Sequence, residues 1–340
     1  MSSEFGSAEF AGVLHEMLDG ADVPAVARRW AEDDLAPGLA LWRRLAGLGV
    51  TGLAVPEKQG GLGASPLALV AACEELGHHA VPGPVAETLA AVPVLLAGLG
   101  SGAGSVEEWL GGLVAGELIA TVAMPPRLPM AASTEAAGLV LLAAEGVVRA
   151  GRAGTRRRSV DSTRSVADVA GGEVLGTVSG PALMSRAFEF GTLACAAQLL
   201  GAGRALLEAS VRHVRVRTQF GRPVGAFQAV KHKLADVAIG LEFARPLLHA
   251  AAIALGEDAD TAGRDVSAAK VACADAAYRA ARAALQVHGA IGYTEEHDLS
   301  LWLIKIRALL PAWGTQSDHR ARVLKAIGGG LEVVERAGLG

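Results

Sequence analysis

The chain has 340 residues, more than one compact core usually contains, so its length predicts two or three packed segments. Its 31 basic and 35 acidic residues leave no surplus of positive charge for a polyanion such as DNA. Charged residues interrupt the apolar stretches before they reach the roughly 20 residues of a membrane-spanning helix, and the three cysteines lie far apart without metal-ligand spacing. We therefore expect a soluble, cytoplasmic protein with no nucleic acid partner, no membrane span and no metal site.

Residues 1–119 have the spacing of helices. Apolar residues recur every three or four positions, and Pro37, Gly60-Gly61 and Pro82-Gly83-Pro84 interrupt the pattern. The pattern predicts an N-terminal α-helical domain over residues 1–119.

Residues 120–180 favour strands instead. Short β-branched runs at 139–142, 146–148 and 174–178 are separated by glycine, proline, serine and threonine. We predict a small β-domain over this segment.

Helical periodicity returns after Pro181, in long segments rich in alanine and leucine. Four long helices packed as an antiparallel bundle are expected for the C-terminal domain, residues 181–340. Gly201-Ala202-Gly203 lies inside the first of them with no strand before it, so it predicts close helix packing rather than a dinucleotide-binding turn.

Two segments of the C-terminal domain could hold a ligand. In the first, RTQFGRPVGAFQ at 217–228, Arg217 and Arg222 could pair with phosphate oxygens, and Phe220 or Phe227 could face a heterocycle. A solvated turn between helices is the alternative. In the second, QVHGAIGY at 286–293, glycines at a helix end let backbone amides approach a ligand, although a plain helix C-cap would use the same residues.

Four histidines of this half of the chain show no spacing that would make a metal site or a catalytic triad with carboxylates or cysteines. We interpret all four as structural residues. They are His213, His232, His288 and His297.

The longer segments RTQFGRPVGAFQAVKHKLAD (217–236) and QVHGAIGYTEEHDLSLWL (286–303) resemble the acyl-CoA dehydrogenase family. LWRRLAGLGVTGLAVPEKQGGLG (41–63) and CEELGHHAVPGPVAETLA (73–90) extend the resemblance over nearly the whole chain. The resemblance implies a mostly α fold with an N-terminal helical domain, a small reduced β-domain and a C-terminal four-helix bundle.

The resemblance also implies FAD, shared between subunits, with Arg217 at its pyrophosphate. Alanine replaces a usual glycine at position 290. The residues that fall on cofactor-contact positions of the two motifs are Arg217, Gln219, Phe220, Phe227, Gln228, Gln286, Gly289 and Ala290.

The reaction of this family needs a carboxylate that removes the substrate's α-proton while hydride passes to the flavin. The resemblance places Trp313 at the usual position of that glutamate and Gly191 at the alternative one, and neither can accept a proton. Glu189 is two residues from Gly191, about 200° around a helix, and we interpret it as a surface or helix-start carboxylate. We therefore expect no catalytic residue in this chain.

The β-domain also departs from the family, because Thr121 to Pro126 is all that remains of two motifs that hold the flavin ring. These departures predict a non-catalytic subunit, inactive alone, of a heteromeric acyl-CoA dehydrogenase. It resembles the α2β2 assemblies of actinobacterial steroid side-chain breakdown, in which a catalytic partner would bind most of the acyl-CoA. Two alternatives stay open: a homomeric enzyme whose base has moved to Glu189, and a flavin-free binding or scaffold protein of the same fold.

Overall fold

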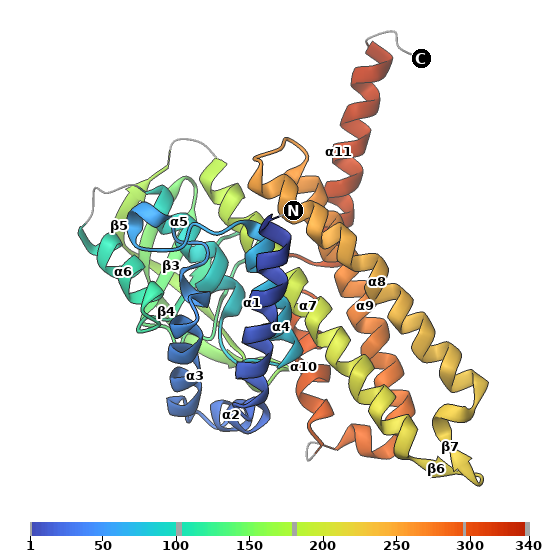
Figure 1. Ribbon diagram of the computed structural model, residues 1–340. Coiled ribbons are helices and arrows are strands. Elements are labelled where there is room, and N and C mark those ends of the chain that lie inside the picture. Colours follow the sequence, from blue (N-terminus) through green and yellow to red (C-terminus); the bar gives the residue numbers. More distant parts are fainter. Residues whose placement is uncertain (1, 100–103, 179–181, 295–296, 337–340) are drawn as a thin grey trace.

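The protein is described here by a computed structural model of residues 2–99, 104–178, 182–294 and 297–336 (Figure 1). Helices come first, a small sheet follows, and long helices complete the chain. The expectation of a mostly α fold with these three parts in this order is confirmed.

The N-terminal part is a layer of short helices around an apolar core. Proline and a side-chain cap begin several of them; at α4, Pro66 takes the first helical position and the Ser65 hydroxyl accepts a hydrogen bond from the Ala68 amide. The helices are α1 (Ser2–Asp19), α2 (Val23–Ala31), α3 (Ala36–Gly47), α4 (Pro66–His78), α5 (Val92–Gly98) and α6 (Gly104–Val114), with one-turn helices η1 (Val50–Gly52), η2 (Glu57–Gln59) and η3 (Glu87–Ala91).

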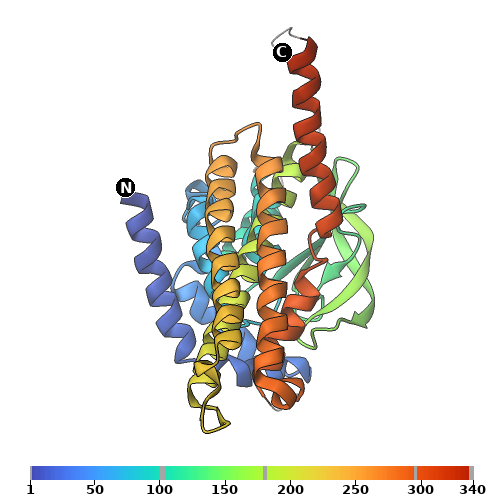
Figure 2. The ribbon, with the colours of Figure 1, turned by 90° about the vertical axis from the view of Figure 1, so that its right-hand side faces the viewer.

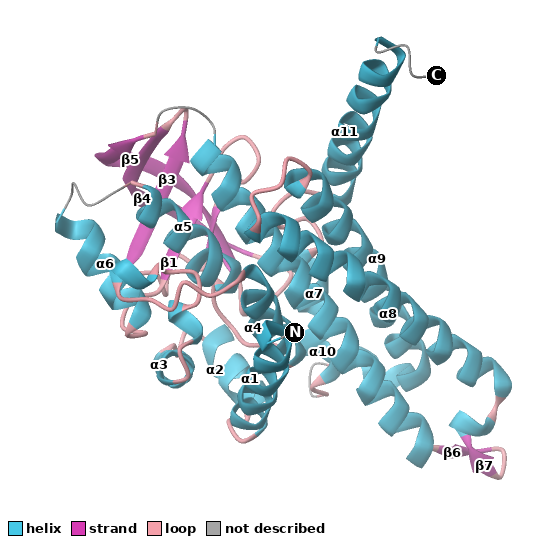
Figure 3. Ribbon diagram, turned by 45° about the horizontal axis from the view of Figure 1, so that its top comes forward, coloured by secondary structure: helices cyan, strands magenta, loops and turns pink. Residues whose placement is uncertain are grey.

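The middle of the chain forms a five-stranded sheet in the order β1-β3-β4-β5-β2. β1 and β3 pair in parallel, and the other neighbours are antiparallel. The sheet lies on the side of the molecule away from the long helices α8 and α9 (Figure 3). The strands are β1 (Ala120–Ala123), β2 (Ala131–Ala132), β3 (Leu139–Ala144), β4 (Val147–Arg158) and β5 (Ser165–Thr177).

The C-terminal part is a bundle around α7, which is buried along most of its length. α8 and α9 run side by side, and α11 projects beyond the bundle (Figure 2). α11 follows the four helices α7 to α10 as a further helix. The elements are α7 (Ala182–Val216), β6 (Thr218–Gln219), β7 (Arg222–Pro223), η4 (Val224–Ala226), α8 (Gln228–Gly256), α9 (Ala262–His288), η5 (Gly289–Tyr293), α10 (Leu299–Leu309) and α11 (Gln316–Arg336).

Glycines allow the N-terminal part to pack directly on the bundle. A Cβ on Gly201 of α7 would lie 1.8 Å from the Glu74 carbonyl oxygen of α4, and one on Gly77 of α4 would lie 2.2 Å from the Gln198 carbonyl oxygen of α7. A Cβ on Gly203 would meet a Leu241 methyl group at 2.8 Å. The close helix packing predicted for residues 201–203 is therefore confirmed.

α7 and α8 are long and apolar enough to cross a membrane by length and composition. The apolar window of α7 is 89% buried inside the protein, so its side chains belong to the core, whereas that of α8 is only 39% buried. α8 presents Ile239, Phe243 and Leu247 at four-residue spacing, and Phe243 is 72% exposed. Their spacing places these three side chains on one face of the helix, where they form an exposed apolar stripe.

Candidate functional site

The first of the two motifs folds as a hairpin beyond the end of α7. Phe220 and Gly221 occupy its turn with φ angles of 54° and 78°. Two left-handed residues in a two-residue connection are typical of a type I′ turn, in which glycine is favoured and a bulky side chain is strained. Phe220 nevertheless stands in the turn with 91% of its surface exposed. The hairpin therefore holds an aromatic ring out in solvent.

The hairpin and the start of α8 also carry a second aromatic ring and several polar side chains. Phe227 packs edge-to-face on Phe220 with 6.2 Å between ring centroids, and the Arg222 guanidinium lies 4.1 Å over the Phe227 ring. Arg217, Gln219 and Gln228 are exposed. Among the residues that the structure describes, none hydrogen-bonds to their side chains, and Arg217 has no ion-pair partner. The hairpin thus carries unpaired donors beside an aromatic pair.

The second motif lies at the same end of the bundle. α9 ends at His288, and Gly289 follows with φ of 63°. The ring of His288 lies 4.3 Å from that of His213, in the last turn of α7, so the ends of α7 and α9 are neighbours (Figure 1). Gln286 and Ala290 are both exposed there.

Gln286 also lines an open groove of about 1060 Å³ between α8 and α9. Lys233, Arg279 and Arg282 line the groove and outnumber its single carboxylate, Asp236, so the groove is basic. The predicted hairpin contacts do not line it, although Ala229, next to Gln228, does. The two motifs therefore lie at the same end of the bundle. Their residues face two surfaces that are adjacent but separate.

Trp313 lies at the opposite end of α7, in the connection from α10 to α11. Its indole is fully buried, and Nε1 donates a hydrogen bond of 3.2 Å to Oε1 of the buried Glu87. The Phe188 ring of α7 packs beside it at 5.8 Å. Trp313 has a positive φ of 59°, and Gly314 follows with φ of 98°. The indole is thus a packed part of the core.

Gly191 directly faces this indole. A Cβ built on Gly191 would lie 2.4 Å from two atoms of the Trp313 ring, closer than non-bonded atoms can approach. The two positions at which the family resemblance places the base are therefore in contact. One holds the indole, and the other lacks a side chain because the indole fills the space.

Glu189 corrects one of our expectations, because it is neither on the surface nor at the start of its helix. It is only 6% exposed, lies in the third turn of α7, and pairs with the guanidinium of Arg322 from α11. Burial raises the pKa of Glu189, although the hydrogen bond and charge of Arg322 oppose the rise. Its carboxylate is held by Arg322, while the indole packs on Gly191.

A cavity of about 470 Å³ lies on the other side of Phe188, where the remaining Thr121–Pro126 segment meets the start of α7. Met124, Pro125 and Met184 contribute apolar surface, and Arg127 lies over the Phe188 ring at 5.1 Å. The cavity walls are mostly apolar, and the polar side chains that line it are those of Arg127, Glu145 and Ser185.

A buried ionic cluster lies under Trp313, and it was not predicted from the sequence. Glu87 lies 3.6 Å from Arg164, and Asp161 lies 3.5 Å from Lys305, around a cavity of about 10 Å³. Glu87 is the single acidic or basic residue other than histidine between Glu75 and Glu107. A lone charge in such an apolar segment was the signal that could have found it.

Comparisons with known proteins identify the family of this chain. Residues 10–117 match the family model of the acyl-CoA dehydrogenase N-terminal domain, and residues 179–328 match that of the C-terminal domain. The acyl-CoA dehydrogenase IpdE2 of Mycolicibacterium smegmatis is 30% identical over 307 residues, which cover 88% of this chain and 92% of that protein. This chain belongs to the acyl-CoA dehydrogenase family.

Other similar proteins point the same way. IpdE2 of Mycobacterium tuberculosis is 29% identical, covering 82% of this chain and 84% of the relative. A structure described as the Tcur3481-Tcur3483 steroid ACAD has a TM-score of 0.84 and 24% identity, covering 97% of this chain and 99% of that one. The ChsE4-ChsE5 complex from Mycobacterium tuberculosis gives a TM-score of 0.81 and 23% identity, with 95% and 97% covered. At these identities the structures establish a shared fold.

Family membership makes the chain an oxidoreductase of the flavoprotein class, with FAD as its cofactor. The residues of the bundle end fit the diphosphate part of that cofactor. Arg217 is exposed and lacks an ion-pair partner among the described residues, and the groove at Gln286 carries an excess of cations. A guanidinium and backbone amides are suitable partners for phosphate oxygens.

Proposed function

We propose that this chain is the non-catalytic, FAD-clamping subunit of a heteromeric acyl-CoA dehydrogenase, which carries out α,β-dehydrogenation of an acyl-CoA thioester. One observation carries the proposal: the Trp313 indole fills the space over Gly191, so neither position can present a carboxylate. Removal of the substrate's α-proton then requires a base from another chain. This chain alone is inactive under the proposal.

FAD, when bound, accepts the hydride that leaves the β-carbon of the substrate. The residues of this chain would orient the cofactor rather than react with it. Arg217 would neutralise the diphosphate, while Gln219, Gln228 and Gln286 supply amide groups. Phe220 and Phe227 offer ring faces to the adenine, and the backbone at Gly289 and Ala290 can approach closely because side chains there are absent or small.

The partner in this proposal is a catalytic acyl-CoA dehydrogenase chain that carries the missing glutamate. The apolar stripe of Ile239, Phe243 and Leu247 on α8 supports such a partner, because an exposed patch beside a ligand site is typical of an interface. The likeness to the ChsE4-ChsE5 complex also supports an assembly of two different chains. We infer a heterotetramer.

The substrate part of the proposal rests on the relatives. A neighbour described as a steroid ACAD supports a steroid side-chain CoA, bound mainly by the partner subunit in the cytoplasm. The division of the chain into domains 1–119, 120–180 and 181–340 belongs to the same proposal. The middle domain would be a reduced remnant, because its cavity offers few polar groups to a flavin ring.

The test is co-expression with a second acyl-CoA dehydrogenase chain that retains the glutamate, encoded beside the gene for this chain. We expect a yellow complex that reduces a dye with an acyl-CoA, and a colourless, inactive chain when this protein is purified alone. Arg217→Ala should lower the flavin content of the complex several-fold, whereas Arg152→Ala, on an exposed strand position, should leave it unchanged. A complex without flavin, or no complex at all, would refute the proposal.

One observation favours a homomeric enzyme as the second candidate, since Glu189 is a buried carboxylate with a raised pKa. In that case the chain purified alone would be yellow and active, and Glu189→Gln would abolish dye reduction. A colourless chain that forms a colourless complex would instead indicate a flavin-free scaffold of the same fold.

A further inference from the structure

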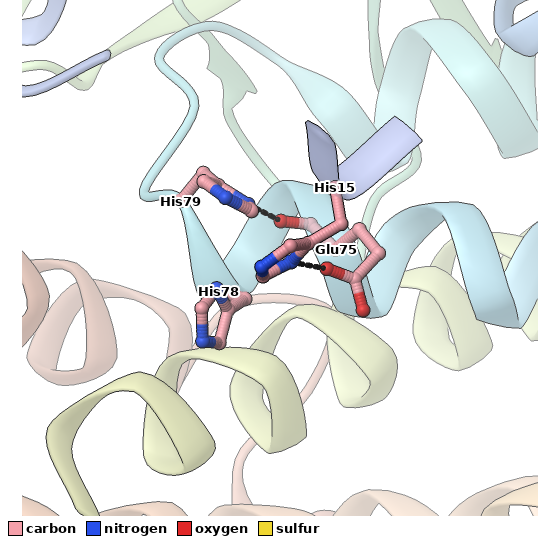
Figure 4. A group of neighbouring side chains, drawn as sticks. All are labelled: His15, Glu75, His78 and His79. Carbon is pink, nitrogen blue, oxygen red and sulfur yellow. Dashed lines mark hydrogen bonds and ion pairs between the residues drawn. The ribbon is translucent and has the colours of Figure 1, made fainter. Parts of the chain in front are cut away.

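Three histidines meet at the contact between α1 and α4, more than 130 residues before either flavin motif in the sequence. His15 comes from α1, His78 is the last residue of α4, and His79 is the C-cap of that helix (Figure 4). Their ring centroids lie 4.7 to 5.1 Å apart. With Glu75 of α4, each residue can offer one ligand atom so that all four atoms lie within 4.8 Å of one another.

Glu75 provides an acceptor for Nδ1 of both His15 and His79, and Nε2 of each ring faces the carboxylate of Asp19. Nδ1 of His15 lies 2.8 Å from Oε2 of Glu75, and Nδ1 of His79 lies 3.0 Å from the backbone oxygen of Glu75. Both acceptors lack hydrogens when Glu75 is ionised, so the N–H of each ring is placed at Nδ1. Nε2 of each ring then carries the lone pair. Metal-binding histidines are commonly oriented by a carboxylate or carbonyl in this way.

Asp19 faces both of these nitrogens. Its Oδ1 lies 3.0 Å from Nε2 of His79, and its Oδ2 lies 3.5 Å from Nε2 of His15. His15 and Asp19 are four residues apart on α1 and therefore share a face. Ligands of a tetrahedral zinc ion, each about 2.0–2.1 Å from the metal, lie about 3.3 Å from one another. The two distances from Asp19 oxygens to the imidazole nitrogens, 3.0 and 3.5 Å, lie close to that value.

His78 offers a third nitrogen. Its Nε2 lies 3.0 Å from Oε2 of Glu208 on α7, which is a suitable acceptor for the ring N–H. Its Nδ1 is buried and has no hydrogen-bond partner among the described residues. A buried nitrogen with an unused lone pair costs free energy unless a proton donor or a cation reaches it.

The charges around the histidines favour a cation. Three carboxylates contact the rings, those of Asp19, Glu75 and Glu208, and two guanidinium groups lie beside them, those of Arg204 and Arg212. One negative charge is therefore in excess. The C-terminal end of α4 adds the negative end of its dipole at His78.

We propose that His15, His78, His79 and Asp19 form a binding site for a divalent ion of the zinc class, with Glu75 and Glu208 orienting the imidazoles. Imidazole nitrogens with one carboxylate are the ligand set that such an ion prefers. The ion would fasten α1 to the end of α4. It could enter through a pocket of about 840 Å³ that these residues share with His213, His288 and Trp302. The pocket also reaches the ends of α7 and α9, where the two flavin motifs begin.

The test is metal titration of the purified, metal-free chain alone. Zn²⁺ competes with a chromophoric chelator, and Co²⁺ reports coordination through its visible absorption. We expect one tight equivalent of Zn²⁺, a tetrahedral Co²⁺ spectrum, and a melting temperature raised by Zn²⁺. His79→Gln should weaken Zn²⁺ binding by more than about 100-fold, because even outer hydrogen-bonding partners of metal ligands contribute about 10- to 100-fold.

Asp19→Asn provides a second variant that is expected to fold, because the Asp19 side chain is 65% exposed. It should also weaken Zn²⁺ binding and reduce the rise in melting temperature. His232→Gln is the matched control, since His232 is an exposed histidine of α8, and it should bind Zn²⁺ as the wild type does. Absence of a tight equivalent in the wild type, or equal binding by Asp19→Asn and His232→Gln, would overturn the site. Neither result bears on flavin binding, which is measured in the complex.

Discussion

The two ends of α7 use their aromatic and polar groups in opposite ways. Near Gly191 the Trp313 ring is buried and its N–H is bonded to Glu87. At the other end, about 37 Å along the helix, Phe220 is exposed in a strained turn and Arg217 has no ion-pair partner among the described residues. At the end where the family resemblance places the chemistry, the indole fills the space and its N–H has a hydrogen-bond partner. The hairpin end keeps its aromatic and charged groups exposed to solvent, so one end of the helix is packed and the other is open.

The largest effect on stability should come from removing the indole at the packed end of α7. Trp313→Ala removes a fully buried indole and the donor to Glu87, so it should lower the free energy of unfolding by about 3–5 kcal/mol in urea denaturation. Phe220→Ala, at the exposed end, should change it by less than about 0.5 kcal/mol. Equal effects of the two variants would contradict the contrast between the ends.

The next largest effect should be a loss of folding stability in acid, which arises near the same packed end. The buried His319 ring lies 2.8 Å from the Trp313 carbonyl oxygen, and burial lowers the pKa of His319 from 6.5 to about 4. The unfolded chain therefore binds this proton first, so stability is present above about pH 6.5 and declines as the pH falls toward 4. The full difference is about 3 kcal/mol. The stability of His319→Asn should depend less on pH than that of the wild type over this range, in urea titrations at each pH; parallel profiles would argue against a neutral His319.

Adding a methyl group at Gly191 should have a smaller, conditional effect. Gly191→Ala places a Cβ against the Trp313 ring and should cost about 1–3 kcal/mol. In a Trp313→Ala background the same change should cost much less, because the clash is gone. A double-mutant cycle by urea denaturation measures the coupling, and additive costs would mean that the two residues do not compete for this space.

The smallest effect on stability should come from a change in the hairpin turn. Phe220→Asn places a residue that tolerates a left-handed conformation at φ of 54°, and it should raise the free energy of unfolding by up to about 1 kcal/mol. The same variant should reduce flavin retention in the complex, because it removes an aromatic face. Unchanged retention would indicate that Phe220 is only a turn residue.

Local patterns predicted the segments of the fold well. Apolar spacing indicated the helical blocks, and the glycines and prolines near 221–223 indicated the turn that the structure shows as a hairpin. Glu189 shows the limit of such reasoning. Helix geometry places it about 200° from Gly191, but only Arg322, contributed by α11 more than 100 residues later, makes that other face a buried one.

The histidine cluster shows the same limit. His15 and Asp19 are separated from His78 and His79 by about 60 residues, so no spacing rule connects them. We expected no metal site, because no pair of cysteines or histidines with the ligand spacing of a zinc site occurs among residues close in sequence. The contact between α1 and α4 brings the four side chains together.

The amino-acid sequence by itself determined which residues can do chemistry: an indole at 313, no side chain at 191, and a motif with arginine and amides at 217–228. These are properties of residue types, and they hold in any conformation. Only the tertiary structure decided that the indole and the glycine fill one space, that Glu189 is paired, and that three histidines converge. Those facts depend on how helices distant in sequence pack, because side-chain contacts and burial arise from that packing.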